Sequence, residues 1–223
     1  MKAMILSAGR GERMRPLTDT TPKPLLKVAD QCLIEYHIKA LVKAGINQLV
    51  INHAWLGKQI EQVLGDGRRY GAKIIYSPEA SALETAGGII NALSLLGDEP
   101  FIVVNSDVFT DYPFEHLIKL KLNKWAHLVM VDNPLHHPQG DFYCQNNRVS
   151  NQLKYTSQSK YTFSGIALYN PVFFHGLPGG KRALAPLLKA AMAENQVSGE
   201  YYQGLWLDIG TPERLVELDR ELR

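Results

Sequence analysis

Residues 3–28 read AMILSAGRGERMRPLTDTTPKPLLKV, and they decide the fold that the sequence predicts. A short apolar run, Ala3 to Leu6, passes directly into a loop that contains Gly9 and Gly11. In open α/β sheets, ligands bind beyond the carboxyl ends of the strands. Glycines at such a point let main-chain amides approach a phosphate or a base closely. We therefore expect a strand of a parallel sheet that ends in an anion-binding loop.

The loop differs from the two best-known phosphate-binding motifs. The third glycine of a dinucleotide fingerprint would fall at Met14, and the Gly-Lys-Ser/Thr ending of a Walker loop is absent. What strengthens the pattern is Arg13 together with Lys23, whose backbone is stiffened by the prolines on either side. We interpret the other cations of the loop as solvated or structural: Arg10, Arg15 and Lys27.

Further apolar, β-branched runs alternate with segments of helical spacing. We expect a parallel sheet covered by helices on both faces. Strands are predicted at Ala3–Leu6, Leu49–Ile51, Lys73–Tyr76, Phe101–Val104 and Leu128–Val131, with helices that end near Gly45 and Gly65. After Asn133 we expect a loop and then antiparallel or edge strands at Phe142–Gln152 and Tyr161–Tyr169. A helix is expected over Leu184–Glu194, and a last helix is expected to be capped by Thr211, with Pro212 at its first position.

Composition limits the kind of protein. With 223 residues and no linker-like stretch, the chain fits a single domain. A net charge of +2 argues against a surface that coats nucleic acid. Cys32 and Cys144 are too few for a disulfide framework or a zinc cluster. The N-terminus resembles a strand rather than a signal peptide, and no run is long enough to span a bilayer, so we expect a soluble cytoplasmic protein.

Two aspartates follow apolar strands and are candidate metal ligands. The segment FIVVNSDVF places Asn105 and Asp107 just beyond a strand, where a carboxylate can hold Mg²⁺. A single aspartate there is more often a turn residue or a helix cap. Asp208, in LWLDIGT, offers a partner in the same context, whereas other aspartates lie in plain turns: Asp66, Asp98 and Asp111.

A third segment, ALETAGGI, places small residues at a predicted helix start. Gly87 and Gly88 allow either flat packing against a nucleobase or close contact between helix and sheet, and composition does not separate the two. The adjacent histidines His136 and His137 lack the spacing of a metal site. There is no G-x-S-x-G elbow, which weakens a hydrolase interpretation.

In order and spacing, the motifs LSAGRGERMRPLTDTTPKPLLKV, VNSD and WLDIGTPERL resemble those of the sugar-1-phosphate nucleotidyltransferases. The resemblance implies a Rossmann-like α/β fold, with a mostly parallel central sheet flanked by helices and a small antiparallel substrate-binding extension. It implies that residues 1–133 mainly bind nucleotide, and that residues 134–223 mainly bind the sugar phosphate and supply the second metal ligand. The implied reaction joins a nucleoside triphosphate to a sugar 1-phosphate and releases pyrophosphate, with Mg²⁺ as cofactor.

The resemblance also assigns roles to residues. Arg13 and Lys23 become catalytic, and Asp107 and Asp208 become the metal ligands. The nucleotide is held by Ala8, Gly9, Gly11, Glu12, Arg13, Lys23, Gly88 and Asn105. The sugar phosphate is held by Gly140, Asp141 and Asn151, and Arg148 or Lys154 is a candidate for the positive charge beside the sugar. The nucleobase is recognised near Pro78 and Glu79, together with Gly87 and Gly88.

Within the family, the segments INHAWLG, LETAGG and VDNPLHHPQGDF are most similar to uridylyltransferases that act on UTP and N-acetylmuramate α-1-phosphate in peptidoglycan recycling. Guanylyl transfer to mannose 1-phosphate, thymidylyl or uridylyl transfer to glucose 1-phosphate, and a nucleotide sensor of the same fold remain alternatives. The chain departs from the family at Ser7, at Ser106 and over Asn151–Lys154, where relatives place an acidic residue followed by Lys-Pro. We expect small-molecule substrates, no membrane or nucleic-acid partner, and a monomer or small homo-oligomer.

Overall fold

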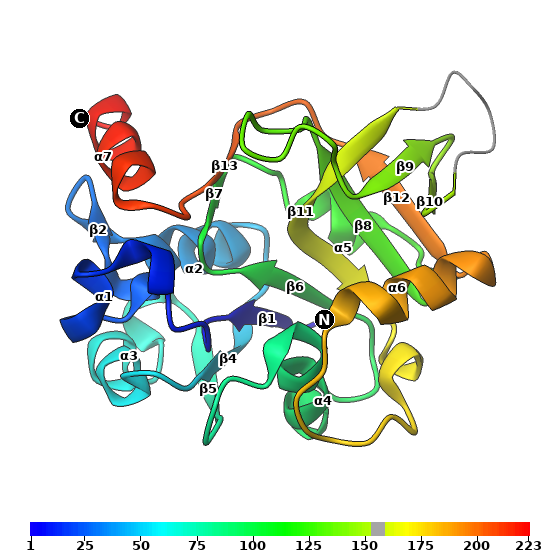
Figure 1. Cartoon of the computed structure of the whole chain (residues 1–223). Coiled ribbons are helices and arrows are strands. Elements are labelled where there is room, and N and C mark those ends of the chain that lie inside the picture. Colours follow the sequence, from blue (N-terminus) through cyan, green and yellow to red (C-terminus); the bar gives the residue numbers. More distant parts are fainter. Residues whose placement is uncertain (153–158) are drawn as a thin grey trace.

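A computed structural model describes residues 1–152 and 159–223. Its centre is a nine-stranded sheet in the order β5-β4-β1-β6-β11-β8-β12-β10-β9 (Figure 1). The four strands of the N-terminal half run parallel to one another, so their carboxyl ends meet at one edge. These strands are β1 (Ala3–Leu6), β4 (Gln48–His53), β5 (Lys73–Pro78) and β6 (Phe101–Asn105).

The other half of the sheet is mixed. Strand β11 (Lys160–Tyr169) joins the halves, since it pairs antiparallel with β6 on one side and with β8 (Ala126–Val131) on the other. Beyond β8 lies β12 (Val197–Tyr201), which runs parallel to it. A hairpin of β9 (Phe142–Gln145) and β10 (Arg148–Ser150) completes this half.

Two small sheets flank the central one. Strand β7 (Val108–Thr110) pairs with β13 (Trp206–Asp208), which brings the C-terminal part of the chain beside the end of β6. Strand β2 (Lys27–Val28) pairs with β3 (Gln31–Cys32) directly after the first loop. Both small sheets therefore hold segments near the carboxyl ends of the parallel strands.

Helices cover both faces of the sheet. They are α1 (Leu17–Thr20), α2 (Leu33–Lys43), α3 (Gly57–Leu64), α4 (Glu84–Leu96), α5 (Glu115–Lys119), α6 (Leu184–Ala193) and α7 (Pro212–Glu221), with short 3₁₀ turns η1 (Glu12–Met14), η2 (Lys23–Leu25), η3 (Arg68–Tyr70) and η4 (Pro171–Phe174). None of the helices in the described ranges is long and apolar enough to pass through a membrane.

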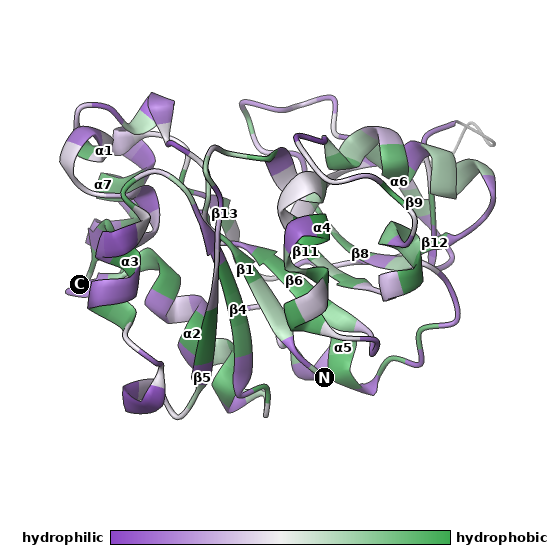
Figure 2. Ribbon diagram, turned by 90° about the horizontal axis from the view of Figure 1, so that it is seen from below, coloured by the Kyte–Doolittle hydropathy of each residue, from purple (hydrophilic) through white to green (hydrophobic). Residues whose placement is uncertain are grey.

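The alternation of side chains along β1 explains why its sequence is continuously apolar. Ala3 and Ile5 belong to the buried cluster under α2, α3 and α5, whereas Met4 belongs to the cluster under α4 and α6. A strand with both faces covered has no solvent side, so no polar alternation appears. Figure 2 shows the apolar strands between the layers of helices. The predicted fold class is confirmed.

The antiparallel or edge strands expected over Phe142–Gln152 are present as a hairpin of β9 and β10, because Asn146 and Asn147 take φ of +51° and +57°, as a tight two-residue turn requires. Two other features differ from the expectations. Strand β12 was not predicted, since its sequence VSGEY carries a glycine and a glutamate. Thr211 does stand at the N-cap of α7 with Pro212 first, but its side chain makes no capping hydrogen bond.

Candidate functional site

A cavity of about 350 Å³ opens beyond the carboxyl ends of β1 and β6. It is lined by the first loop, the end of β6 and the segment after β13. Its residues include most of those predicted to bind the triphosphate and the metal: Gly9, Gly11, Glu12, Arg13, Lys23, Asn105 and Asp107. The structure therefore brings together in one cavity residues from Leu6 to Gly210, which lie 204 positions apart in the sequence.

The two glycines of the loop serve different purposes. Gly11 has φ of +70°, and a Cβ on it would lie 3.0 Å from Thr18 Cγ2 and 3.3 Å from Lys23 Cβ. The Thr18 hydroxyl donates a hydrogen bond of 2.8 Å to the Gly11 carbonyl, which closes the loop on itself. Gly9 has no atom within 4 Å of its Cβ position and borders the cavity. Gly11 shapes the loop, and Gly9 leaves room beside it.

Lys23 and Asp107 form an ion pair on the wall of this cavity. Lys23 Nζ lies 2.7 Å from Asp107 Oδ2. The lysine is 8% exposed, at the first position of η2 after Pro22, and Asp107 lies in the turn between β6 and β7. A buried ammonium group requires a charged or hydrogen-bonding partner. Asp107 supplies one here, at a place where phosphate oxygens could approach the same cation.

A buried histidine holds the strand that follows Asp107. His37 of α2 has its pKa lowered to about 4, because burial disfavours the charged ring. The neutral ring must then donate its Nε2 hydrogen to the Val108 carbonyl, 2.6 Å away, since a carbonyl only accepts. This contact ties β7 to α2 and fixes the backbone next to Asp107.

Asp208 and Arg13 meet over Gly210. A Cβ on Gly210 would lie 3.1 Å from Asp208 Oδ2 and 3.2 Å from Arg13 Nη2, so only glycine leaves these groups their present positions. Asp208 also accepts a hydrogen bond of 2.5 Å from Arg214, and His136 Nε2 lies 3.1 Å from Asp208 Oδ1. Asp208 does not line the first cavity, although Arg13 and Gly210 do; it borders a separate cavity of about 420 Å³ together with His136 and Arg214.

The two aspartates suit a hard cation that keeps part of its shell for substrate. Asp107 directly precedes β7, and Asp208 is the last residue of β13, the strand that pairs with β7; the Ile209 amide donates a hydrogen bond of 2.7 Å to the Asp107 carbonyl. Among the described residues there is no group of three or more His, Cys, Asp or Glu side chains that could enclose a metal. Mg²⁺ typically binds one or two carboxylates and takes its other ligands from water and phosphate oxygens. The donor set fits that description.

A second, smaller cavity of about 150 Å³ adjoins the first at Leu6, Gly9 and Thr85. Behind it lies a buried polar network. Asn52 accepts a hydrogen bond of 2.9 Å from the Ser7 amide and donates one of 2.7 Å to Glu79, whose other oxygen accepts the Leu83 amide. Asn52 was not predicted as a site residue from the sequence. Like Asp107, however, it is a polar residue near the carboxyl end of a parallel strand, here β4.

Gly87 and Gly88 face the protein rather than these cavities. A Cβ on Gly88 would lie 2.8 Å from both Asn52 Nδ2 and Glu79 Oε1, and one on Gly87 would lie 2.4 Å from the Gly180 carbonyl. Of the two interpretations left open by the sequence, the structure places both glycines in close packing contacts. A role for Gly88 in nucleotide binding stays a prediction.

A third cavity of about 380 Å³ lies between α4, α6 and β11 and shares Thr85 and Asn105 with the first. Its wall is largely apolar, with Phe142, Phe163, Leu184 and Leu188. Asp141 borders it and is held in place, because Oδ2 accepts the Phe163 amide at 2.8 Å and Oδ1 lies 3.2 Å from His137 Nε2.

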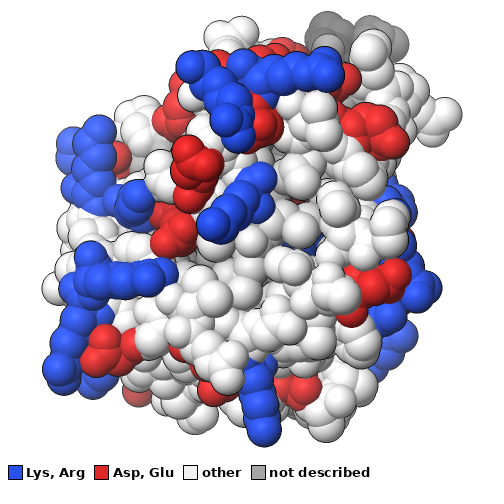
Figure 3. All heavy atoms as spheres, turned by 90° about the vertical axis from the view of Figure 1, so that its left-hand side faces the viewer, with Lys and Arg blue, Asp and Glu red and all other residues white. Residues whose placement is uncertain are grey.

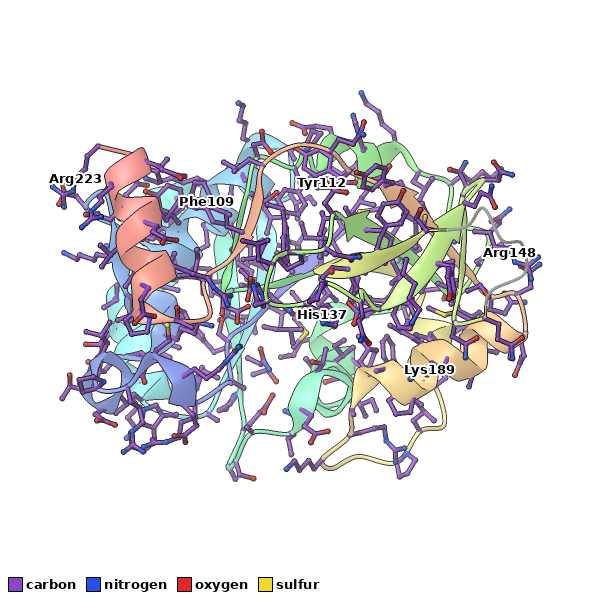
Figure 4. All side chains as sticks on the ribbon, turned by 45° about the horizontal axis from the view of Figure 1, so that its top comes forward. Phe109, Tyr112, His137, Arg148, Lys189 and Arg223 are labelled. Atoms are coloured by element: carbon purple, nitrogen blue, oxygen red, sulfur yellow. The ribbon has the colours of Figure 1, made fainter. Side chains whose placement is uncertain are left out.

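The other residues predicted for the sugar do not line this cavity. Gly140, with φ of +59°, is pressed against Asn133 and shapes the loop before Asp141. Asn151 is exposed at the end of the β9–β10 hairpin, and Lys154 lies outside the described residues. Figure 4 shows Arg148 at the outer edge of the molecule, away from His137.

Comparison with known proteins gives a consistent result. A family model described as nucleotidyl transferase matches residues 2–142. An N-acetylmuramate alpha-1-phosphate uridylyltransferase of Neisseria meningitidis serogroup B is 54% identical, over 97% of this chain and 96% of that protein. The beta catalytic subunit of mannose-1-phosphate guanylyltransferase from Drosophila pseudoobscura is 32% identical over 95% of this chain, which spans 59% of that relative.

Two solved structures share the fold. A putative glucose-1-phosphate thymidylyltransferase from Bacillus anthracis superposes with a TM-score of 0.87 at 21% identity, covering 100% of this chain and 95% of that one. HddC from Yersinia pseudotuberculosis superposes with a TM-score of 0.80 at 18% identity, covering 100% of this chain and 99% of that one. The resemblance seen in the sequence motifs is confirmed, and the chain belongs to the nucleotidyl transferase family.

Proposed function

We propose that the protein joins UTP and N-acetylmuramate α-1-phosphate to give UDP-N-acetylmuramate and pyrophosphate. The 54% identity to the Neisseria uridylyltransferase over nearly all of both chains supports this choice of substrates. The structural observation that carries the proposal is the Lys23–Asp107 pair in a cavity beyond β1 and β6. A cation suited to phosphate beside a carboxylate suited to a metal supports phosphoryl-transfer chemistry.

The reaction needs positioning and charge neutralisation more than proton transfer. An oxygen of the sugar 1-phosphate attacks the α-phosphorus of UTP, and the bond from that phosphorus to the oxygen bridging to the β-phosphate breaks, so pyrophosphate leaves. The nucleophile is already anionic at neutral pH, and no general base is required. Lys23 and Arg13 would neutralise phosphate charge and hold the groups in line. This agrees with the absence of any serine–histidine elbow motif in the sequence.

Asp107 and Asp208 would hold Mg²⁺. When bound, the ion supplies positive charge to the phosphate oxygens and to the departing pyrophosphate. The Asp107 carboxylate is held by Lys23, and the Asp208 carboxylate is held by Arg214. These cations would pass to phosphate or solvent when the aspartates take up the metal.

The three adjoining cavities suggest where each substrate part binds. We assign the triphosphate to the cavity at Lys23, the base to the small cavity near Asn52, and the sugar to the apolar cavity at Asp141. The apolar wall suits the N-acetyl methyl group. The sugar cavity is lined by Glu84, Thr85 and Asn105 from the first part of the chain and by residues after 140. This shared lining supports a single domain, in which residues 1–133 mainly bind the nucleotide and residues 134–223 mainly bind the sugar phosphate.

These substrates imply a cellular setting. UTP is a cytoplasmic metabolite, and N-acetylmuramate comes from peptidoglycan, so we place the enzyme in the cytoplasm in recycling of the cell wall. Figure 3 shows acidic and basic side chains interspersed over the face that carries α7, which supports the expectation that nucleic acid is not a partner. The oligomeric state stays a prediction.

A screen of substrate pairs tests the proposal. The purified protein is incubated with Mg²⁺ and with UTP plus N-acetylmuramate 1-phosphate, GTP plus mannose 1-phosphate, or dTTP or UTP plus glucose 1-phosphate, and pyrophosphate is measured. We expect the highest kcat/KM with the first pair. A higher value with another pair would overturn the substrate assignment. Tight UTP binding without pyrophosphate from any pair would instead support a nucleotide sensor.

A further inference from the structure

A buried histidine contacts the backbone that links the two candidate metal ligands. Val108 follows Asp107 directly in the chain, and in the antiparallel pairing of β7 with β13 it lies opposite Asp208. His37 Nε2 donates a hydrogen bond of 2.6 Å to the Val108 carbonyl, which can only accept. The ring of one α2 residue is therefore bonded to the backbone unit that is next to both aspartates.

The Val108 carbonyl depends on this hydrogen bond. The Ile209 amide donates to the Asp107 carbonyl, and opposite residues in an antiparallel ladder alternate between pairs with and without ladder hydrogen bonds. The next pair, Val108 and Asp208, is therefore one without them, and the Val108 carbonyl points away from β13. Val108 is 3% exposed and His37 is 2% exposed, so bulk water has little access to the contact. Loss of the histidine donor would leave a buried carbonyl in need of another partner, and the backbone would shift to find one.

The ion pair with Lys23 does not by itself fix Asp107 when ligands bind. Lys23 Nζ lies 2.7 Å from the Asp107 carboxylate in the structure, but a bound phosphate would compete for the same ammonium group. In the described part of the chain, His37 borders none of the three cavities of the site, so a substrate in those cavities does not replace its hydrogen bond. The contact between His37 and Val108 therefore continues to hold the backbone of Asp107 after the lysine has turned to phosphate.

We propose that His37 is a positioning residue that sets the affinity of the site for Mg²⁺, because it holds Val108 and thereby fixes the spacing of Asp107 and Asp208. This inference rests on the Mg²⁺ site of the proposed nucleotidyl transfer. His37 touches neither the metal nor the substrates, and its effect passes through the backbone. Groups that hold metal ligands in place typically account for about 10- to 100-fold in metal affinity or activity.

Two substitutions at His37 test the hydrogen bond. His37→Leu has a similar volume and no donor, whereas His37→Gln keeps an N–H group that can reach the Val108 carbonyl. We expect the Mg²⁺ concentration that half-saturates pyrophosphate release to rise about tenfold or more in His37→Leu and to stay near the wild-type value in His37→Gln. If His37→Leu does not fold, His37→Asn, whose amide is too short to reach Val108, is measured in its place.

Calorimetric titration with UTP, without sugar phosphate, gives a readout that does not need turnover. The Kd of UTP is measured in EDTA and in excess Mg²⁺, and the ratio of the two values is the gain in affinity that the metal provides. We expect a clear gain in the wild type and in His37→Gln. In His37→Leu the gain should fall toward one, while the Kd in EDTA stays near that of the wild type.

His127→Leu is the matched control, because His127 is also buried but its Nδ1 lies 3.0 Å from Ser198 Oγ, in another part of the sheet. It should lose stability in denaturant without a change in Mg²⁺ dependence. Three results would overturn the inference: wild-type Mg²⁺ dependence in His37→Leu, an equal loss of the gain in His127→Leu, or a wild type whose UTP affinity does not depend on Mg²⁺. If the gain is lost in His37→Leu as expected but no sugar phosphate reacts with the wild type, the proposed function fails while this inference stands.

Discussion

Lys23 and Asp107 lie 84 residues apart in the chain, and Lys23 Nζ contacts Asp107 Oδ2 at 2.7 Å on the wall of the main cavity. The loop after β1 brings the lysine, and the turn after β6 brings the aspartate. Because β1 and β6 are parallel neighbours, their carboxyl ends meet at one place. A buried cation is thereby held next to a carboxylate that suits a metal, and each partner can be tested separately.

Replacing Asp107 by asparagine should remove most of the activity. The amide keeps the shape of the side chain but has no charge to hold Mg²⁺, so we expect pyrophosphate release to fall by at least about 100-fold. The amide oxygen can still accept a hydrogen bond from Lys23, whose side chain is only 10% exposed, so the fold should remain. Pyrophosphate assays over a Mg²⁺ titration, with thermal unfolding alongside, measure both effects. An Asp107→Asn enzyme with full, metal-dependent activity would contradict the metal assignment, and Asp66→Asn in an exposed turn is the control.

Replacing Lys23 by alanine tests the other half of the pair. Removing one preorganised electrostatic donor typically costs about 10²–10³-fold in rate, and we expect a loss of that order in kcat. Lys27→Ala is the matched control, because Lys27 is exposed on β2 and borders none of the three cavities, so its rate should stay near that of the wild type. If Lys23→Ala reacted as fast as Lys27→Ala, Lys23 would have no role in phosphate contact.

The sequence predicted the parts of the site that follow simple strand rules. Gly9, Gly11 and Asp107 come directly after apolar strands, and parallel strands place such residues at one edge. Asp208 was also identified by its position after an apolar run. The rules do not state which strands are neighbours, so the contact between Lys23 and Asp107 was not predicted from the residues.

The remaining parts depend on contacts that leave no local pattern. Asn52 in β4 and Glu79 directly after β5 form a hydrogen bond across 27 residues of sequence, and each alone looks like an ordinary strand-end polar residue. For a different reason, the sequence did not show which of the residues predicted for the sugar border a cavity, and their role stays a prediction. Asn146 and Asn147 form a tight turn that ends β9 early, and Asn151 is carried away from the cavity by the resulting hairpin.

Two buried histidines should make the protein less stable in mild acid. Burial lowers the pKa of His37 to about 4, and burial also lowers the pKa of His127. The unfolded chain takes up these protons near pH 6.5 while the folded chain does not, so the free energy of unfolding decreases as the pH falls from about 6.5 toward the folded pKa values. Each histidine contributes a slope of at most about 1.4 kcal/mol per pH unit.

Denaturant unfolding at pH values from 7.5 to about 4.5 measures that slope. His37→Gln and His127→Gln should each make the dependence shallower, whereas His116→Gln should not, since His116 is exposed. A wild-type free energy of unfolding that stays constant between pH 7 and 5 would be incompatible with two neutral buried rings.

Gly88→Ala and Gly9→Ala should separate packing from ligand contact. A Cβ on Gly88 would lie 2.8 Å from Asn52 Nδ2 and Glu79 Oε1, and neither can retreat freely, because Asn52 holds the Ser7 amide and Glu79 holds the Leu83 amide. Overpacking of this kind costs about 1–3 kcal/mol, partly offset by the better helix propensity of alanine. We therefore expect Gly88→Ala to lower the free energy of unfolding and the affinity for UTP together.

Gly9→Ala is the contrast, because no atom lies within 4 Å of its Cβ position and the added methyl group would project toward space that borders the main cavity. It should leave the free energy of unfolding near the wild-type value and weaken UTP binding alone. Unfolding in denaturant and calorimetric titration with UTP give the two quantities for both variants. If Gly88→Ala instead behaved like Gly9→Ala, stable but weak in UTP binding, then Gly88 would contact the nucleotide, as the sequence predicted, and its closeness to Asn52 would be without consequence for stability.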